Sequence, residues 1–249
     1  MSSTPSLARV GETLRPYAAS PVDVVGAPAT GRGLAHPAYL DTMMSAAAQV
    51  DPEFFSRFLP PDDGGGRQSS VLLLFGPGPD GADSVLLTER SHTMRSHPGQ
   101  ISLPGGRAEP DDADVVATAL REAHEEVLLD PAGVEVLGTL PPLFLPPSDN
   151  VVTTVVGWWR EPCAVGVGDP AEVETVILAP VSHLTDPAVR HTVVHPLGFR
   201  GPAVDLGDDL LLWGFTAGLV TKALELAGLE RSWDHTVTRP LPDRLAGRR

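Results

Sequence analysis

Cysteine and lysine are almost absent from this chain of 249 residues. Cys163 is the single cysteine, which excludes an intrachain disulfide and leaves no set of thiolates for a metal site. Lys222 is the single lysine beside seventeen arginines, a bias that we attribute to coding rather than to function. A disulfide scaffold and a thiolate-ligated metalloprotein are therefore excluded.

Long apolar runs are absent too. The longest uncharged one, residues 210–221, is too short to cross a bilayer, and the first residues lack the charged-then-apolar pattern of a signal peptide. The formal net charge of −14 would repel a polyanion such as nucleic acid. We therefore expect a soluble, cytoplasmic protein that acts on a small molecule, with neither nucleic acid nor membrane as a partner. A homodimer is compatible with the sequence.

Patterns along the chain predict one main domain with flanking segments. Residues 1–35 are predicted to be a variable, partly disordered arm, 36–66 a helical lead segment with a loop, 67–231 the main domain and 232–249 a C-terminal tail. A proline-rich loop at 141–147, a helix at 210–229 and the following strands are predicted: 71–75, 84–88, 134–140, 151–159, 173–180, and a late hairpin at 191–199 and 203–206. Mixed strand and helix periods favour an α/β sandwich around a mixed sheet.

The most informative segment is a predicted helix that carries three carboxylates within five residues, at Glu122, Glu125 and Glu126. Glu122 faces both partners through i,i+3 and i,i+4 relations, which is mutually destabilising without a counter-ion. A cation-binding face is one interpretation, and a solvated acidic face is the other. Four apolar side chains at helical spacing form the expected core face: Val116, Leu120, Ala123 and Val127.

Residues near this helix favour the cation-binding interpretation. Asp111 and Asp112, just after Pro110, are predicted to cap its N-terminus. Arg121 precedes Glu125 by four residues and is placed to hold its carboxylate. Carboxylate oxygens without soft ligands suit Mg²⁺ or Mn²⁺ rather than zinc.

The upstream glycine and the acidic helix together resemble the Nudix box, G-x5-E-x7-R-E-U-x-E-E-x-G-U, in which U is an aliphatic residue. The matching positions are Gly106, Arg121, Glu122, Ala123, Glu125, Glu126 and Leu129. The interval from Gly106 to Arg121 is one residue longer than the pattern, with Asp112 in the place of the first glutamate. Leu128 replaces the late glycine. The resemblance implies a Nudix-type α/β/α sandwich.

Residues 86–106 resemble the signature L-L-T-x-R-S-x-x-L-R-x-H-x-G-Q-x-x-F-P-G-G of the coenzyme A-directed branch of that family. Met94 and Leu103 replace the usual Leu and Phe, and the longer interval before Arg121 also looks like that branch. The resemblance implies a coenzyme A diphosphatase that yields 3′,5′-ADP and 4′-phosphopantetheine or its acyl form. Five residues are predicted to bind the substrate: Arg90, Arg95, His97, Gln100 and Arg107.

The charge of this segment agrees with an anionic ligand. Residues 90–107 contain three arginines, two histidines and no acid, within a strongly acidic chain. Arginine forks pair with phosphate oxygens, and coenzyme A carries a diphosphate and a 3′-phosphate. The alternative is that Arg90 and Arg95 lie along the surface or pair with nearby acids.

The same resemblance implies roles in metal-assisted hydrolysis of a diphosphate. Predicted metal ligands are Glu122, Glu125, Glu126 and the carbonyl of Gly106; predicted catalytic residues are Arg121, Glu122, Glu125 and Glu172. The family takes its general base from the box or from a downstream loop. Glu172 matches the downstream acid, Glu174 is the second choice, and a solvated loop acid is the alternative. His124 faces away from the carboxylates, and structural roles are expected for His191 and His195.

Three functions stay open. The first is a coenzyme A diphosphatase, and the second is a Nudix hydrolase for another diphosphate, such as a dinucleotide or a nucleotide sugar. Loss of activity without the 3′-phosphate separates these two. The third is a non-enzymatic ligand sensor, which the repelling set of Glu122, Glu125 and Glu126 argues against, because such a set has no purpose without a cation.

Overall fold

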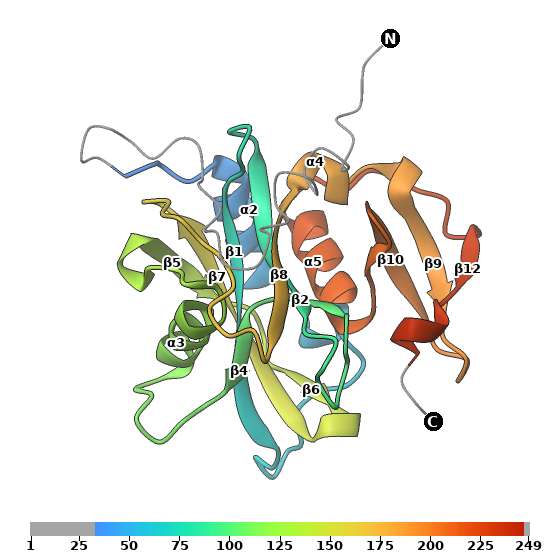
Figure 1. Ribbon diagram of the computed structural model, residues 1–249, viewed down its shortest axis with the longest axis horizontal. Coiled ribbons are helices and arrows are strands. Elements are labelled where there is room, and N and C mark those ends of the chain that lie inside the picture. The colour runs from blue at the N-terminus through green and yellow to red at the C-terminus, as the bar shows by residue number, and fades with distance from the viewer. Residues whose placement is uncertain (1–32, 247–249) are drawn as a thin grey trace.

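The main domain is built on a mixed sheet of eight strands (Figure 1), in a computed structural model that describes residues 33–246. The strands are β1 (Arg67–Pro77), β2 (Asp83–Arg90), β3 (Ile101–Ser102), β4 (Gly105–Arg107), β5 (Val134–Thr139), β6 (Leu143–Leu145), β7 (Asn150–Trp159) and β8 (Val173–Pro180). The order along the sheet is β3-β2-β1-β7-β5, while β4, β6 and β8 pair with β1, β7 and β2. The pair β1–β7 is parallel and the others are antiparallel. The predicted arm, 1–35, lies almost wholly outside the described residues.

Helices cover both faces of this sheet (Figure 1). On one face lies α3 (Val115–Val127), and on the other lie α2 (Ala38–Ala47) and α5 (Gly214–Leu226). Because side chains alternate along a strand, β1 serves both cores: Leu74 packs with the α3 cluster and Phe75 with the opposite one. The predicted α/β/α sandwich around a mixed sheet is confirmed.

A second sheet of four strands stands beside α5 (Figure 1). In spatial order its strands are β11 (Leu210–Leu212), β10 (Arg200–Gly207), β9 (Arg190–Val194) and β12 (Thr238–Pro240). The antiparallel pair β9–β10 confirms the predicted late hairpin. The short helix α4 (Val181–Leu184) connects β8 toward this sheet.

Two local predictions are wrong. Residues 210–212 form β11 rather than the start of a helix, because Asp208 and Asp209 adopt φ of 48° and 63° and turn the chain back onto β10. The proline-rich loop predicted at 141–147 contains β6, which pairs with β7. Within residues 33–246, prolines begin four of the five 3₁₀ turns, because the first residue of such a turn does not need its N–H as a donor. These four are Pro52–Phe54, Pro131–Gly133, Pro146–Ser148 and Pro187–Val189; the fifth is Asp243–Leu245.

Both flanking segments pack onto the sandwich. The predicted helical lead supplies α2, which lies against α5. Ahead of α2, the N–H of Leu34 donates to the carbonyl of Arg160 at 2.7 Å, and the Trp158 indole donates to the carbonyl of Leu34 at 2.8 Å. The segment predicted as a tail, 232–249, contributes β12 and the buried Leu245, so through residue 246 it is part of the folded body.

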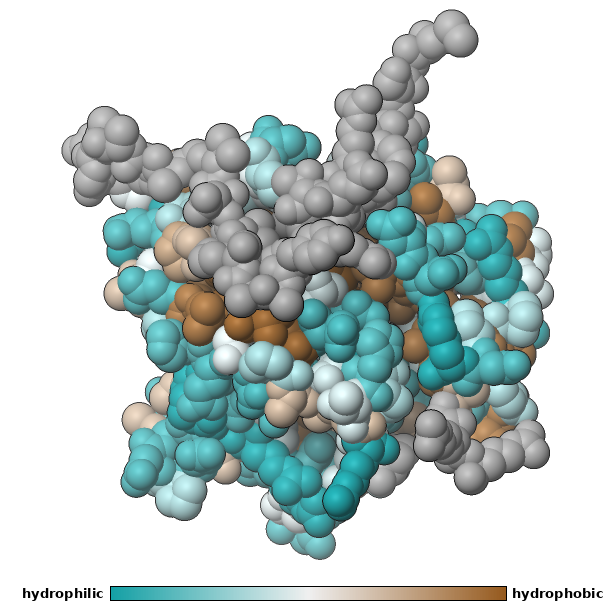
Figure 2. Space-filling view, viewed as in Figure 1, coloured by the Kyte–Doolittle hydropathy of each residue, from teal (hydrophilic) through white to brown (hydrophobic). Residues whose placement is uncertain are grey.

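The visible surface of the molecule is largely hydrophilic (Figure 2). On the face seen in Figure 2 hydrophilic residues dominate, and apolar surface shows mainly in a central area and in smaller areas over the second sheet. Within residues 33–246, each helix is too short or too polar to cross a membrane.

Candidate active site

The helix α3 begins at Asp114 rather than at the predicted cap residues. The Asp114 carboxylate accepts hydrogen bonds from the backbone N–H groups of Val116 and Ala117, at 2.9 and 2.8 Å. The prediction of a cap at Asp111 or Asp112 is wrong, because the Asp112 carboxylate is occupied by other partners.

The same helix ends at the position where the Nudix pattern has its late glycine. Leu128 takes the left-handed conformation there, with φ 59° and ψ 24°, and its N–H donates to the carbonyl of His124 at 3.0 Å. The replacement of glycine by leucine therefore leaves the end of the helix in place. It keeps the carboxylates on the last two turns.

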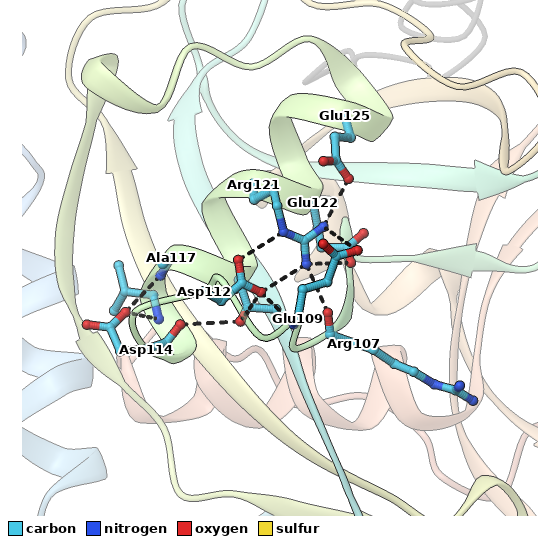
Figure 3. Close-up of polar contacts among 10 residues, drawn as sticks. Arg107, Glu109, Asp112, Asp114, Ala117, Arg121, Glu122 and Glu125 are labelled. Carbon is cyan, nitrogen blue, oxygen red and sulfur yellow. Dashed lines mark hydrogen bonds and ion pairs between the residues drawn. The ribbon is translucent and has the colours of Figure 1, made fainter.

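Arg121 ties α3 to the loop that precedes it (Figure 3). Its Nε and Nη2 donate to the two oxygens of Asp112 at 2.9 and 3.0 Å. Its Nη1 donates to Glu125 Oε2 at 3.0 Å, which confirms the predicted contact, and Nη2 also reaches the carbonyl of Arg107 at 2.9 Å. Hydrogen bonds from Arg121 hold the pKa of the Asp112 carboxyl well below its ordinary value. Helical spacing does not predict this Asp112 contact, although the longer interval between Gly106 and Arg121 marks the loop that makes it.

Replacing Arg121 with lysine is expected to lower the melting temperature by several degrees. Lysine keeps the charge but cannot make two parallel hydrogen bonds to Asp112 while also reaching Glu125. Differential scanning calorimetry measures the change. Arg160→Lys is the matched control, because Arg160 is an exposed arginine whose ion pair is with Glu161. Equal melting temperatures for the two variants would contradict the role given to Arg121.

Glu126 is the buried carboxylate of the site, with 4% of its surface exposed. The N–H of Gly105 donates to its Oε2 at 3.1 Å. Burial raises the pKa of the Glu126 carboxyl to about 8, and the charges of Glu122 and Glu172 add to that, while Gly105 and Arg90 act in the opposite sense. A carboxylate held under these conditions favours either a proton or a cation.

Gly106 lets a second carboxylate come close to the same strand. It lies in β4 opposite Ser70 of β1, and a Cβ atom added to it would overlap the carboxylate of Glu122. Burial raises the pKa of the Glu122 carboxyl, and Arg121, 3.1 Å from its Oε1, lowers it. Gly106 and the Glu122 carboxylate therefore lie side by side.

Glu172 lies in the turn just before β8, and Arg90 is the last residue of β2. The charge of Glu172 raises the pKa of both Glu122 and Glu126, so its carboxylate lies near theirs. Its carbonyl accepts a hydrogen bond from the N–H of Ser91 at 2.7 Å, which fixes it beside Arg90. Three segments far apart in sequence thus contribute to this cluster: the end of β2, the helix α3 and the turn before β8.

Of the predicted substrate-binding residues, Arg90, His97 and Gln100 interact with one another. The N–H of Arg90 donates to the carbonyl of Gln100 at 2.9 Å, and the N–H of Gly99 donates to the carbonyl of Arg90 at 3.0 Å, which closes the loop of residues 91–99. Desolvation, and then the nearby Arg90, lower the pKa of the His97 imidazole, while the Gln100 side chain donates to the carbonyl of Leu245 at 3.4 Å. Arg95 and Arg107 are exposed, and the Arg107 side chain extends away from the Arg121 network (Figure 3).

The donor atoms suit a hard divalent cation, but they are not gathered around one point. Among residues 33–246, no three histidine, cysteine or acidic side chains lie in an arrangement that could already hold a metal ion. Glu125 is half exposed and held by Arg121. The oxygen-only donors, with the half-buried Glu122 and the buried Glu126 repelling each other, fit Mg²⁺ or Mn²⁺ in their chemistry. Metal binding by Gly106 and the three glutamates stays a prediction.

Three histidines lie where structural roles were expected. His124 Nδ1 is 2.9 Å from the carbonyl of Leu129, at the end of α3, and so turns away from the carboxylates. His191 is buried in β9, and the His195 ring stacks on Trp213 with centroids 6.0 Å apart.

This chain is similar to several known proteins. Residues 67–194 match the NUDIX domain. Nudix hydrolase 15, mitochondrial, of Arabidopsis thaliana is 36% identical over 169 residues, which are 63% of this chain and 57% of that protein. The uncharacterized Nudix hydrolase NudL of Enterobacter sp. (strain 638) is 35% identical over 160 residues, 59% of this chain and 76% of that one. A solved NUDIX hydrolase from Nitrosomonas europaea is 15% identical with a TM-score of 0.44, covering 71% and 80% of the two chains. This chain spans little more than half the length of the plant relatives that it matches.

Proposed function

Because this chain belongs to the Nudix family, we propose that it is a metal-dependent hydrolase that cleaves the diphosphate bond of coenzyme A or a derivative. Its products are 3′,5′-ADP and 4′-phosphopantetheine, or the acyl form of the latter. The proposal rests on the coenzyme A-like segment 86–106 and on where that segment lies relative to α3. We place the reaction in the cytoplasm.

The position of Arg90 carries this proposal. It belongs to the coenzyme A-like segment, and its charge acts on Glu126 of α3. Its Nε is buried and has no hydrogen-bond partner among residues 33–246. Because buried donors are nearly always paired, this N–H awaits an acceptor, and an oxygen of a bound diphosphate supplies one. The residues that resemble a substrate signature thus lie beside the carboxylates that resemble a metal site.

Each group then has a role in hydrolysis. The following would hold Mg²⁺ or Mn²⁺: Glu122, Glu125, Glu126 and the carbonyl of Gly106. Nudix hydrolases generally use such ions, which neutralise charge on phosphate oxygens and acidify a bound water. Arg121 orients Glu125 through their 3.0 Å contact, and Arg90 pairs with the diphosphate. Glu172, near both buried glutamates, accepts the proton of the attacking water.

Substrate choice is tested by comparing coenzyme A with dephospho-coenzyme A in the presence of Mn²⁺ or Mg²⁺. Chromatography should resolve 3′,5′-ADP as a product of the first. Loss of the 3′-phosphate should lower kcat/KM by about tenfold or more, because charge-assisted hydrogen bonds are lost. Arg90→Gln should lower kcat/KM for both substrates, whereas Arg160→Gln, far from the cluster, should not.

Two outcomes would contradict the proposal that coenzyme A is the substrate. Equal rates with and without the 3′-phosphate indicate a Nudix hydrolase for nucleoside diphosphate derivatives in general. Binding of coenzyme A and metal without any product indicates a ligand sensor.

A further inference from the structure

A pocket is lined by residues of α5, of β9 and β10 in the second sheet, and of the segment 228–235. In Figure 1, α5 and the second sheet lie on the other side of the eight-stranded sheet from α3. The volume of the pocket is about 890 Å³. The side chains that matter for its chemistry are Arg190, Arg200, Lys222, Glu230, Trp233 and His235. None of the residues that line it belongs to the candidate active site, so the proposed hydrolysis leaves this pocket without a role.

Arg190 is a buried cation in the wall of this pocket, with 6% of its surface exposed. Its Nη1 donates to Glu230 Oε1 at 3.1 Å, and its guanidinium carbon lies 4.9 Å from the centroid of the Trp233 ring. Its Nε has no hydrogen-bond partner in the described part of the chain. A guanidinium has five N–H donors, and one carboxylate oxygen with one ring face leaves this buried charge incompletely compensated.

Trp233 adds a second unmatched donor. Its Nε1 is also buried and lacks a partner within residues 33–246. An indole N–H donates and never accepts, so a ligand atom that satisfies it must be an acceptor. The ring is packed against His235, with centroids 3.8 Å apart.

Both carboxylates that line the pocket already pair with a cation. Glu225 pairs with Lys222 at 2.8 Å and Glu230 with Arg190. Carbonyls at the end of α5 accept hydrogen bonds from the N–H groups of residues 227–229. Arg200, in contrast, is exposed and has no carboxylate within 4.0 Å in the described chain. The unmet groups are therefore donors and a cation, which selects against a metal ion and for an anion.

We propose that this pocket binds a small oxyanion, such as the phosphate or carboxylate group of a metabolite, between Arg190, Arg200 and Trp233. Arg190 and Trp233 both line the pocket, and their unpaired donors lie in its wall. This site is independent of the proposed hydrolysis.

The test is a titration of the metal-free, ¹⁵N-labelled full chain with inorganic phosphate, in EDTA at constant ionic strength. The indole signals of the four tryptophans are followed by NMR, and Trp233→Phe identifies the one that matters. We expect a saturable shift of the Trp233 signal. Acetate in a parallel titration shows whether a carboxylate serves as well as a phosphate.

Variants decide whether the pocket is the site. Arg190→Gln should weaken the apparent affinity about tenfold or more, and Arg200→Gln should weaken it severalfold. Because Arg190 is buried, its variant can fail to fold; Arg200 is exposed, so Arg200→Gln tests the site in a folded protein. Arg160→Gln is the matched control. A Trp233 signal that moves linearly without saturation, or that responds equally in Arg200→Gln and Arg160→Gln, would overturn the proposal.

Discussion

Replacing Glu126 with glutamine is expected to reduce the hydrolysis of coenzyme A by about 10²-fold or more, the scale of other electrostatic groups that act on a transition state. Glutamine has the same shape, and its oxygen can still accept the hydrogen bond from Gly105. The variant lacks the negative charge that Glu126 places beside Glu122, where the cation would be held. Measurement of kcat and KM at saturating Mn²⁺ or Mg²⁺ checks the prediction.

Two controls show whether a loss of activity in Glu126→Gln comes from the metal site. Glu161→Gln removes an exposed carboxylate whose partner is Arg160, and its activity should equal that of the parent. Isothermal titration with Mn²⁺ should show weaker metal binding by Glu126→Gln. Full activity of Glu126→Gln would move the reaction away from α3, because a contaminant or another site would then be responsible.

In the absence of metal, the protein is expected to lose stability as the pH rises from about 4.5 to about 8. The folded pKa of Glu126 is raised to about 8, above its ordinary value of 4.5, so the folded chain holds this proton more tightly than the unfolded one. The stabilising contribution of the protonated form is complete below the lower value and is lost as pH passes through the upper one. A shift of this size corresponds to roughly 3–5 kcal/mol.

Urea unfolding in EDTA at pH 5 and pH 8.5 measures this loss. Other groups titrate in the same range, so the informative quantity is the difference in free energy of unfolding between the parent and Glu126→Gln. That difference should grow in favour of the glutamine variant as the pH rises. Mn²⁺ or Mg²⁺ should reverse the order at pH 8.5, since a cation compensates the buried charge. Parallel pH profiles for the two proteins would contradict the prediction.

The sequence predicts the sandwich well because periodicity reports burial directly. Leu74 and Phe75 are adjacent apolar residues that face opposite cores, as a strand buried on both sides requires. The contact between Arg121 and Glu125 follows from helical spacing alone, and the structure confirms it.

Sequence periodicity does not show which of several similar residues caps a helix or becomes buried. Asp111, Asp112 and Asp114 are all able to cap a helix, and Asp114 does so, while the Asp112 carboxylate binds Arg121 and Thr118. The burial of Glu126 is likewise invisible, because it depends on β4 passing beside α3.

Contacts between segments far apart in the sequence are the other feature that the sequence alone does not predict. The hydrogen bond from Gln100 to the carbonyl of Leu245 joins the coenzyme A-like loop to a segment that looks like a free tail. The pairing of Arg190 with Glu230 and Trp233 likewise joins residues some forty positions apart. No spacing rule links such partners.

The leucine that ends α3 says something about sequence patterns themselves. Leu128 occupies a left-handed conformation that suits glycine, at a cost on the order of 1 kcal/mol, and nearly half of its surface is exposed. The late glycine of the pattern thus reflects a requirement for a left-handed backbone conformation, and this chain keeps that conformation with a different residue. A sequence search that requires glycine at this position would reject a chain whose helix ends in the same way. Homologues that lack this glycine are better sorted by whether their chain still turns at this point.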